Sequence, residues 1–496
     1  MSKPEDLSDR RARLTPAQRA LLEKRLRSGG AARAGEERDS SIAPRPDRAA
    51  APASFGQRRL VRFAESRPAS LAYNVYYAIG LRGPLAPEIL ARSVRAVVER
   101  HEALRTRFDV TGDGELVAVA SPDLVPTSLP LVDLGDLAGM VCREAEAVRI
   151  FTELASPRFE PLRGPLLRTV LIRVSPEEHS LALAVHHCVA DGWSLSLFTR
   201  DLVEIYGKLA AGDSGPLPPA PLQEADFAHW QLRRVREGAL AESLDWWRSQ
   251  LAGAPPAGVA WPDRPRSPGE RRSSRLQPEL VEALKALAQQ ERTTLFVTLL
   301  TGLQVLLHQH TGQTDLVVGT PMALRARPEL AGIFGYLLNV LPLRADLSGD
   351  PSFLGVLQRV RESFLGALAH RLAPIEWLAE ELLPGHDPGV LPWVNVLFNM
   401  PSGEAGHVDP LRAGDVEVLP LLTGELGSEI DLVLYAREVP GGIRLDLGFN
   451  ANLFAPGDAA RLLEGFAALL GEAVVRPDRR LSDLAGAILA PAGSEI

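Results

Sequence analysis

The residues best suited to chemistry lie in one run, HHCVADG, at positions 186–192. The run ends a segment with strand character and leads into a helical pattern. Because successive side chains of a strand point to opposite faces, only one of His186 and His187 can face a given cavity. His187, where the strand gives way to a loop, is predicted to reach a substrate. A histidine, which titrates near neutral pH, suits proton removal from an amine or an alcohol.

A structural role is the alternative interpretation of these two histidines. Taken alone, a histidine on a strand is more often a hydrogen-bonded structural residue than a catalytic one. Here the pair is followed by Asp191 and Gly192, which form a turn into the helix, where a carboxylate suits the positive helix end. The complete spacing favours the functional interpretation.

Covalent and metal-dependent chemistry fit the sequence less well than a direct transfer between two bound substrates. There is no G-x-S-x-G motif, and Cys188 is expected to point away from the face of His187, which favours packing over nucleophilic attack. Adjacent histidines on a strand chelate a metal poorly, and neither C-x-x-C nor H-E-x-x-H occurs, so no metal is expected. Walker-type and G-x-G-x-x-G phosphate loops are absent too, which excludes ATP and dinucleotides as expected cofactors.

Two strands and a helix are predicted to position the histidine run. The strands cover Leu166–Val174 and Ser180–His187, with a turn between them, and the helix runs from about Leu195 to Leu209. An amphipathic helix is predicted over Ala86–Arg100. Elsewhere the pattern predicts helices near 294–310 and 352–371 and strands near 315–319, 393–400, 429–437 and 443–449.

The chain of 496 residues, 46% of them hydrophobic, can bury sizeable cores. At roughly 100–200 residues per domain it has room for two to four folding units. Mixed helices and strands continue on both sides of a region rich in Pro and Gly, residues 212–272, which predicts two α/β lobes. The expected organisation is a flexible leader or docking segment at 1–52, with one helix after Thr15, an N-terminal lobe at 53–235, a C-terminal lobe at 236–490 and a tail at 491–496.

Composition narrows the cellular setting and the class of partner. A net charge of −8 argues against non-specific binding of nucleic acid. Two cysteines, Cys142 and Cys188, cannot make a disulfide framework, which favours a reducing cytoplasm. The N-terminus lacks the apolar core of a signal peptide, and the longest apolar stretch, 294–307, is too short and too polar to span a bilayer. The sequence therefore predicts a cytoplasmic protein without a nucleic-acid or membrane partner.

Other segments occur in a fixed order around the histidine run. They are Ser54–Leu60 (SFGQRRL), Arg100–Phe108 (RHEALRTRF), Trp193–Ser194 directly after the run, Asp226–Trp230 (DFAHW), Trp246–Gly253 (WWRSQLAG), Val318–Arg325 (VGTPMALR) and Gly335–Asn339 (GYLLN). Together they resemble the condensation domain of nonribosomal peptide synthetases, a family of chloramphenicol acetyltransferase-like acyltransferases, from about Ser54 to Leu489. A sixth family motif is degraded at His370–Glu376, and the aromatic residue usual after Leu60 is absent.

The resemblance implies a fold and a division of labour among the residues. The fold would be α/β, with two chloramphenicol acetyltransferase-like lobes, each a mixed sheet with flanking helices, arranged as a V around a tunnel. At the catalytic position, His187 would position or deprotonate the nucleophile, and Gly192 would lend a backbone N–H near the thioester oxygen.

Further residues would support this centre. His186 and an inter-lobe ion pair between Asp191 and Arg325 would be structural at the active site. Ser194 and Asn339 would belong to the substrate tunnel.

The implied activity is condensation of a carrier-protein-bound acyl or peptidyl thioester with an amine or hydroxyl acceptor. The product would be an amide or ester of nonribosomal peptide or hybrid polyketide biosynthesis, as in antibiotics. No intrinsic cofactor is expected, since the substrates arrive on the phosphopantetheine of carrier proteins, or on CoA. Carrier and adenylation motifs are absent, so a free-standing monomer that acts on carriers in trans is expected, with a segment of a megasynthase as the other case.

Two other functions stay open. An acyl-CoA-dependent O-acyltransferase of the wax-ester or polyketide-associated kind shares the histidine run, although the complete segments at 100–108 and 246–253 favour a condensation domain. A catalytically inactive recruiting scaffold is the alternative from a different class, and the intact His187 and Asp191 argue against it.

Overall fold

The computed structural model describes residues 41–46, 50–137, 139–213, 215–255, 259, 269–325, 327–401, 411–425, 429–454 and 456–484. The chain divides into two units, Met1–Pro44 and Arg45–Ile496, and the sheets and helices below all belong to the second. The helix expected after Thr15 and the tail at 491–496 lie outside the described residues.

Six strands form a first sheet, in the order β12-β13-β2-β7-β6-β5. Its neighbouring strands are antiparallel except β5 and β6, which are parallel, so the sheet is mixed. The central strand β7 is apolar along most of its length and buried on both faces, as a strand covered from two sides must be. The strands are β2 (Asn74–Arg82), β5 (Leu131–Asp133), β6 (Leu167–Ser175), β7 (Glu178–His186), β12 (Leu411–Ala413) and β13 (Val416–Glu425).

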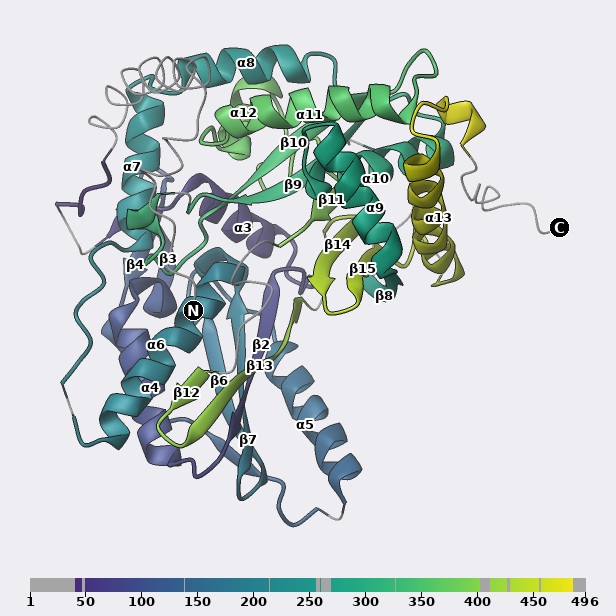
Figure 1. Ribbon diagram of the computed structural model, residues 1–496. Helices are drawn as coiled ribbons and strands as arrows, with labels where there is room; N and C mark the ends of the chain where they lie inside the picture. The colour runs from purple at the N-terminus through teal and green to yellow at the C-terminus, as the bar shows by residue number, and fades with distance from the viewer. Residues whose placement is uncertain are drawn as a thin grey trace, which may run out of the picture. The chain divides into compact units, whose positions relative to one another are not determined.

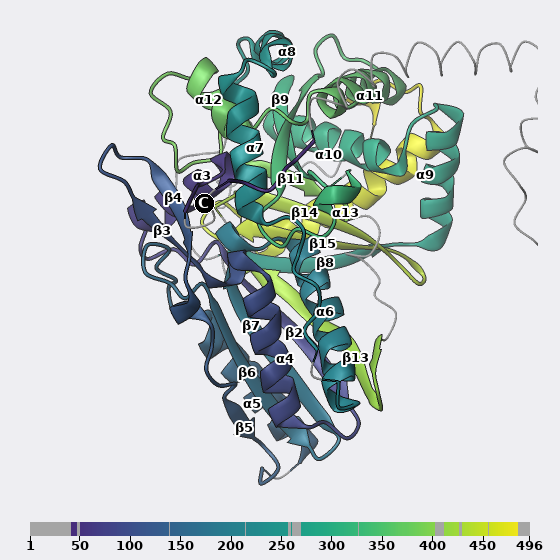
Figure 2. The ribbon, with the colours of Figure 1, turned by 90° about the vertical axis from the view of Figure 1, so that its left-hand side faces the viewer.

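Helices cover both faces of the first sheet. The paired helices α4 (Pro87–Arg100) and α6 (Gly192–Ala210) lie on one side of the strands, and α5 (Met140–Ala155) lies on the other (Figures 1 and 2). The apolar side chains of α4, from Leu90 to Val98, recur at helical spacing and are buried. The predicted helix at 86–100 and the strand–turn–strand–helix unit around the histidine run are therefore confirmed.

A second mixed sheet has the order β10-β9-β11-β14-β15-β8. Here β11 runs parallel to both β9 and β14, and the other neighbours are antiparallel. The strands are β8 (Gly269–Leu276), β9 (Asp315–Ala323), β10 (Leu338–Asp346), β11 (Val396–Asn399), β14 (Leu432–Val439) and β15 (Gly442–Asn450). The helices packed around it are α9 (Pro278–Gln290), α10 (Leu295–Thr311), α11 (Phe353–Ala369) and α13 (Pro456–Val475).

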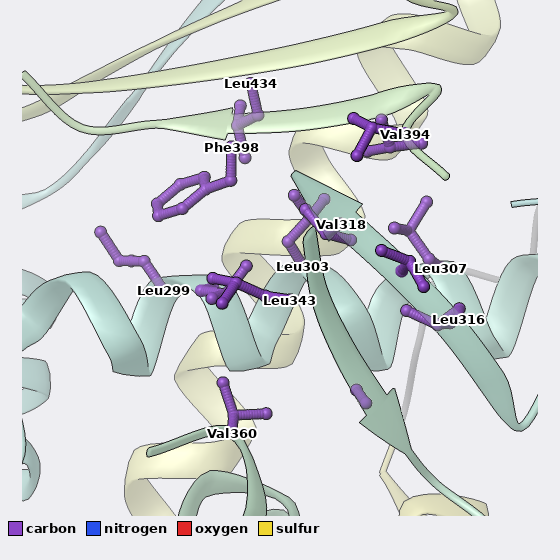
Figure 3. Packing of buried hydrophobic residues seen from close by; sticks show 14 of the residues in the cluster. Leu299, Leu303, Leu307, Leu316, Val318, Leu343, Val360, Val394, Phe398 and Leu434 are labelled. Atoms are coloured by element: carbon purple, nitrogen blue, oxygen red, sulfur yellow. The ribbon is translucent and has the colours of Figure 1, made fainter. Parts of the chain in front are cut away.

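The core of this second lobe is organised around α10. The helix begins at Thr294, whose hydroxyl accepts from the Val297 N–H (3.3 Å), and ends at Gly312 in the left-handed conformation, with φ 72°. Leucines at i, i+4 and i+8 of α10, beginning at Leu299, point into the cluster of β-strand side chains that includes Phe398 (Figure 3). Each such fully buried leucine contributes about 1.5–3 kcal/mol of stability.

A small third sheet and several further helices complete the described fold. A small sheet of β1 (Ala51–Pro52), β4 (Leu116–Ala120) and β3 (Thr106–Val110) lies in the N-terminal part of the chain. Helix α3 (Phe55–Ser66) begins at a capping box between Ser54 and Gln57. It packs against α12 (Ile375–Leu382), which Figure 2 shows beside it. Two further helices of the described part of the chain are α7 (Glu224–Arg236) and α8 (Ala241–Leu251).

The predicted fold class is confirmed: the chain is α/β, with two lobes that each contain a mixed sheet and flanking helices. The sheets do not divide the chain at a single point, because β12 and β13, at 411–425, complete the first sheet. Arg45 and β1, within the expected leader, belong to the large unit, and Arg45 is buried in an ion pair with Asp226 (3.1 Å). Among the described helices none is both long and apolar enough to cross a membrane.

Candidate active site

The histidine run lies where the first sheet meets α6. β7 ends at His186, a single 3-10 turn follows (η3, His187–Val189), and α6 begins at Gly192. The backbone N–H of His187 donates to the carbonyl of Tyr73 just before β2 (2.8 Å), which fixes the turn against the sheet. The two histidine side chains leave this turn in different environments.

His186 is buried and neutral. It is 3% exposed, and its Nδ1 accepts from the backbone N–H of Cys188 (3.3 Å). Burial, and secondarily the neighbouring His187, lower the pKa of His186 to about 3. Burial also raises the pKa of the Cys188 thiol well above its usual range, so this cysteine stays protonated. His186 and Cys188 are thus both packed in the interior, and packing is what the sequence predicted for Cys188.

His187 is half-buried and has the opposite tautomer. Its Nδ1 lies 2.6 Å from the carbonyl oxygen of Ala190. A carbonyl can only accept, so Nδ1 carries the hydrogen, and the lone pair of the neutral ring is on Nε2. This is the form that a general base or a hydrogen-bond acceptor for a nucleophile requires.

Two tyrosines pack edge-on against the imidazole of His187. The ring centroids are 5.3 Å from Tyr336 and 6.4 Å from Tyr73. Arg59 of α3 donates to both hydroxyls, at 2.9 Å to Tyr73 and 3.3 Å to Tyr336. The same guanidinium pairs with Glu376 of α12 (3.0 Å). One buried arginine therefore orients both aromatic neighbours of His187, a role that the sequence motifs do not indicate.

Asp191 is the centre of a buried network between α6 and the second lobe. Its Oδ1 accepts from the Ser194 N–H (2.9 Å), which caps α6. Its Oδ2 accepts from Arg325 Nη1 (2.5 Å) and from the Leu337 N–H (3.1 Å). The side chains of the ion pair are 0% and 1% exposed. The predicted ion pair between Asp191 and Arg325 is present, with its carboxylate fully hydrogen-bonded.

The segment that follows Phe334 is held by three side chains in succession. Ser194 Oγ accepts from the Gly335 N–H (3.0 Å), and Asp191 accepts from the Leu337 N–H. Between them, the Tyr336 N–H donates to Oε1 of Glu224, the first residue of α7 (2.8 Å). Arg325 Nη2 adds a bond to the Gly335 carbonyl (3.1 Å). These bonds fix the backbone that carries the Tyr336 ring to His187.

Gly192 stands at the exposed N-terminus of α6. As the first helical residue it has an N–H that no carbonyl within the helix accepts, and it lies at the positive end of the helix dipole. A Cβ at this position would meet no atom within 4 Å. The space beside Gly192 therefore suits a group brought by a substrate, and its role as an N–H donor stays a prediction.

Ser194 and Asn339 are both buried, with their polar atoms bound to other parts of the protein. Ser194 belongs to the network around Asp191 and Gly335. The Asn339 amide donates to the carbonyl of Ala373 (2.7 Å) and accepts from the Ile375 N–H (3.1 Å), which fixes the start of α12. Neither contact tests a position in a substrate tunnel, which stays a prediction.

A cavity of about 240 Å³ adjoins this site on the other side of Arg59. Its walls are α3, α12 and the residues from Leu383 to Pro392, and its lining includes Arg59 and Glu376, the ion pair whose arginine donates to the two tyrosines. Within the described ranges, His, Cys, Asp and Glu side chains form no group of three that could hold a metal ion. The arrangement offers the ring nitrogen of His187 and, at the start of α6, the backbone N–H of Gly192.

Comparisons with known proteins all find similarity to condensation domains or to peptide synthetases. A family model for the condensation domain matches residues 48–487. The chain is 37% identical over 450 residues to one of the subunits of linear gramicidin synthase from Brevibacillus parabrevis, an alignment that covers 89% of this chain and 6% of that protein. It is 36% identical over 492 residues to phosphinothricin tripeptide synthetase PhsC of Streptomyces viridochromogenes, covering 97% of this chain and 44% of that protein.

A solved structure shares the fold over most of its length. The complex of the X-domain and OxyB from teicoplanin biosynthesis contains a chain that is 28% identical, with a TM-score of 0.79. The match covers 90% of this chain and 98% of that one. Against the two synthetases, by contrast, this chain spans less than half of the relative's length.

Proposed function

Because the chain belongs to the condensation-domain family, we propose that it joins a carrier-bound acyl or peptidyl thioester to an acceptor amine, with a hydroxyl acceptor as the variant that yields an ester. The similarity to nonribosomal peptide synthetases supports an amide as the bond formed. The observation that carries the proposal is the tautomer of His187, which puts a ring lone pair on Nε2, in the same short turn that leads to the buried Asp191–Arg325 ion pair.

The reaction then needs one base, which takes the proton of the nucleophile, and one N–H group, which donates a hydrogen bond to the oxyanion. The acceptor nitrogen attacks the thioester carbonyl carbon, and its proton passes to Nε2 of His187, while the Ala190 carbonyl stabilises the imidazolium through Nδ1. The carbonyl oxygen gains negative charge, which the N–H of Gly192 at the helix N-terminus stabilises. The C–S bond breaks, the thiolate takes the proton from His187, and an amide and a free thiol result.

No resident cofactor enters this scheme. A thioester is already activated, so the phosphopantetheine or CoA arm belongs to the substrate. Since the matching synthetases are longer than this chain, the carrier domains are proposed as partners that present the donor, and an amine, free or carrier-bound, as the acceptor. The protein supplies orientation, a base and a hydrogen-bond donor for the oxyanion.

Mass spectrometry of intact products tests this function. The protein would be offered acyl-carrier or acyl-CoA donors, each with an amine or an alcohol. Amide from the acyl-carrier donor is the expected product. Ester formed only from acyl-CoA would instead identify an O-acyltransferase, and no product from any of the four pairs would contradict a catalytic role.

A recruiting scaffold is the second candidate, and one observation favours it. The X-domain that shares this fold was solved in complex with another protein, OxyB. For this chain, a scaffold would bind a partner without forming product in any of the four pairs above.

Arg59 provides a test of how the site is organised. Changing Arg59 to Met removes the hydrogen bonds to Tyr73 and Tyr336 and leaves Glu376 without its cation. We expect kcat to fall by about tenfold, because His187 loses its fixed neighbours, and the free energy of unfolding to fall by about 3 kcal/mol. Turnover and chemical denaturation measure the two effects.

The matched control is Arg67→Met. This arginine follows α3 directly and pairs with Asp387 in an exposed bridge (3.0 Å), worth about 1 kcal/mol or less. It should leave turnover unchanged. Equal effects of the two variants on kcat would contradict the role of Arg59.

A further inference from the structure

Glu224 is a buried carboxyl group that the proposed mechanism does not use. It is the first residue of α7, 3% exposed. Oε1 accepts from the Tyr336 N–H (2.8 Å), whereas Oε2 is buried and finds no hydrogen-bond partner in the part of the chain that the structure describes. Burying an ionised carboxylate with one oxygen unsatisfied costs several kcal/mol. An ionised Glu224 would therefore destabilise the fold.

The charges around Glu224 disfavour its ionised form. Asp191, at the start of α6, is paired with Arg325, and both groups act electrostatically on Glu224. Cys188 of η3 is neutral, and Asp226 on the same helix is paired with Arg45. Burial first, and then Asp191, raise the pKa of Glu224 well above its usual range, against the opposing effects of the Tyr336 N–H and Arg325. A second full negative charge here would have no cation of its own.

The backbone of Gly335 lies directly against this carboxyl group. A Cβ on Gly335 would be 2.4 Å from both Cδ and Oε2 of Glu224, and the φ of 152° is one that favours glycine. The carboxyl group thus occupies the place where any other residue would carry a side chain. It also holds the next amide, that of Tyr336, whose ring reaches His187 at 5.3 Å.

We propose that Glu224 is a positioning residue that acts as a neutral carboxylic acid, holding Tyr336 against His187 without adding a second anion beside Asp191. This inference rests on the proposed function, because it assigns Glu224 a part in setting the orientation of the proposed base. The neutral group contributes its shape and its acceptor oxygen, and it avoids burying a second full charge. An amide side chain of the same size supplies both.

The first test compares stability in the variant Glu224→Gln and the wild type at about pH 5 and about pH 8. A group whose pKa is higher in the folded than in the unfolded protein stabilises the fold fully below the unfolded value, and this contribution is lost as the pH rises. Wild-type stability should therefore fall relative to Glu224→Gln as the pH rises. Denaturant unfolding should show the variant at least as stable as the wild type, by a margin that is larger at pH 8.

Asp201→Asn is the matched control for this comparison. Asp201 is another buried carboxyl group, but it accepts from His101 and pairs with Arg100 (2.8 and 3.0 Å), so its charge is compensated. The amide at position 201 should destabilise the protein at pH 7. A Glu224→Gln protein that is less stable than the wild type, by a margin that grows with pH, would show that Glu224 works as an anion and would overturn the inference.

The second test separates positioning from simple support of the fold. Glu224→Leu keeps the size of the side chain and removes the acceptor for the Tyr336 N–H. We expect kcat to fall by about 10- to 100-fold in the folded protein, with little change in KM, and Glu224→Gln to restore wild-type turnover. A folded Glu224→Leu protein with wild-type kcat would overturn the positioning role. If the wild type formed no product with any substrate pair, the proposed function would fail, while the stability comparison would still report on Glu224.

Discussion

Replacing His187 by alanine is expected to lower the rate of amide formation by about 10²- to 10⁴-fold, the usual contribution of a general base. The reason lies in the geometry of the ring: Nδ1 donates to the Ala190 carbonyl, so Nε2 is the ring nitrogen whose lone pair can accept a proton from the nucleophile. The side chain is half-buried and packs edge-on against two tyrosines. Single-turnover assays with an acyl-carrier donor measure the loss, and thermal unfolding should show a Tm close to that of the wild type.

The adjacent histidine provides the control. His186 differs from His187 by one position, yet it is buried and binds the Cys188 N–H. Alanine at position 186 should lower the free energy of unfolding by about 1–3 kcal/mol, because it leaves a buried donor unpaired. Unreduced turnover of the His187→Ala protein would refute the assignment of the base. Parallel losses of stability in both variants would mean that the two histidines share a structural role.

Arg325→Ala should be among the most destabilising single substitutions in the protein. It would leave the carboxylate of Asp191 buried without its cation, and it would also remove bonds to the carbonyls of Ile333 and Gly335 (3.1 Å each). Breaking one side of a buried pair costs about 3–5 kcal/mol. Chemical denaturation measures the loss, and turnover should fall as well, because the segment that carries Tyr336 loses its support.

An exposed arginine provides the control for the stability effect of Arg325→Ala. Arg359 pairs with Asp346 at 3.8 Å on the surface, and its replacement by alanine should change stability by about 0.5 kcal/mol or less. The double variant Asp191→Asn with Arg325→Met removes both charges together and should recover part of the lost stability. Arg325→Ala with wild-type stability would show that the pair contributes nothing to the fold.

The sequence predicted well those parts of the site that are local in the chain. The strand, turn and helix around residues 166–210 follow from apolar runs and a capping aspartate, all within a short stretch. The ion pair between Asp191 and Arg325 connects residues 134 positions apart, and it was predicted only because the motifs resembled a known family. Without that resemblance, spacing alone would not have paired them.

The contacts that orient His187 could not be predicted from the pattern of residues in the sequence. Arg59 lies within one of the motifs, but its two tyrosine partners come from different lobes, and a sequence carries no signal for which hydroxyls a buried arginine will reach. Glu224 looks like an ordinary charged residue in the first turn of a helix. Its burial becomes visible only when Gly335 is placed against it. Such residues act through tertiary contacts, which local propensity does not encode.

The late position of β13 in the sequence determines when the first sheet can be completed during synthesis on the ribosome. β2 is made early, near the start of the fold, and pairs with β7 along one edge, but its other edge is covered by β13, which is among the last strands to be translated. Until then the first lobe carries an open edge of backbone N–H and C=O groups, the kind of edge that invites pairing between chains. A nascent or truncated first lobe is thus exposed to misassembly, and the two lobes cannot be separated by cutting the chain once between them.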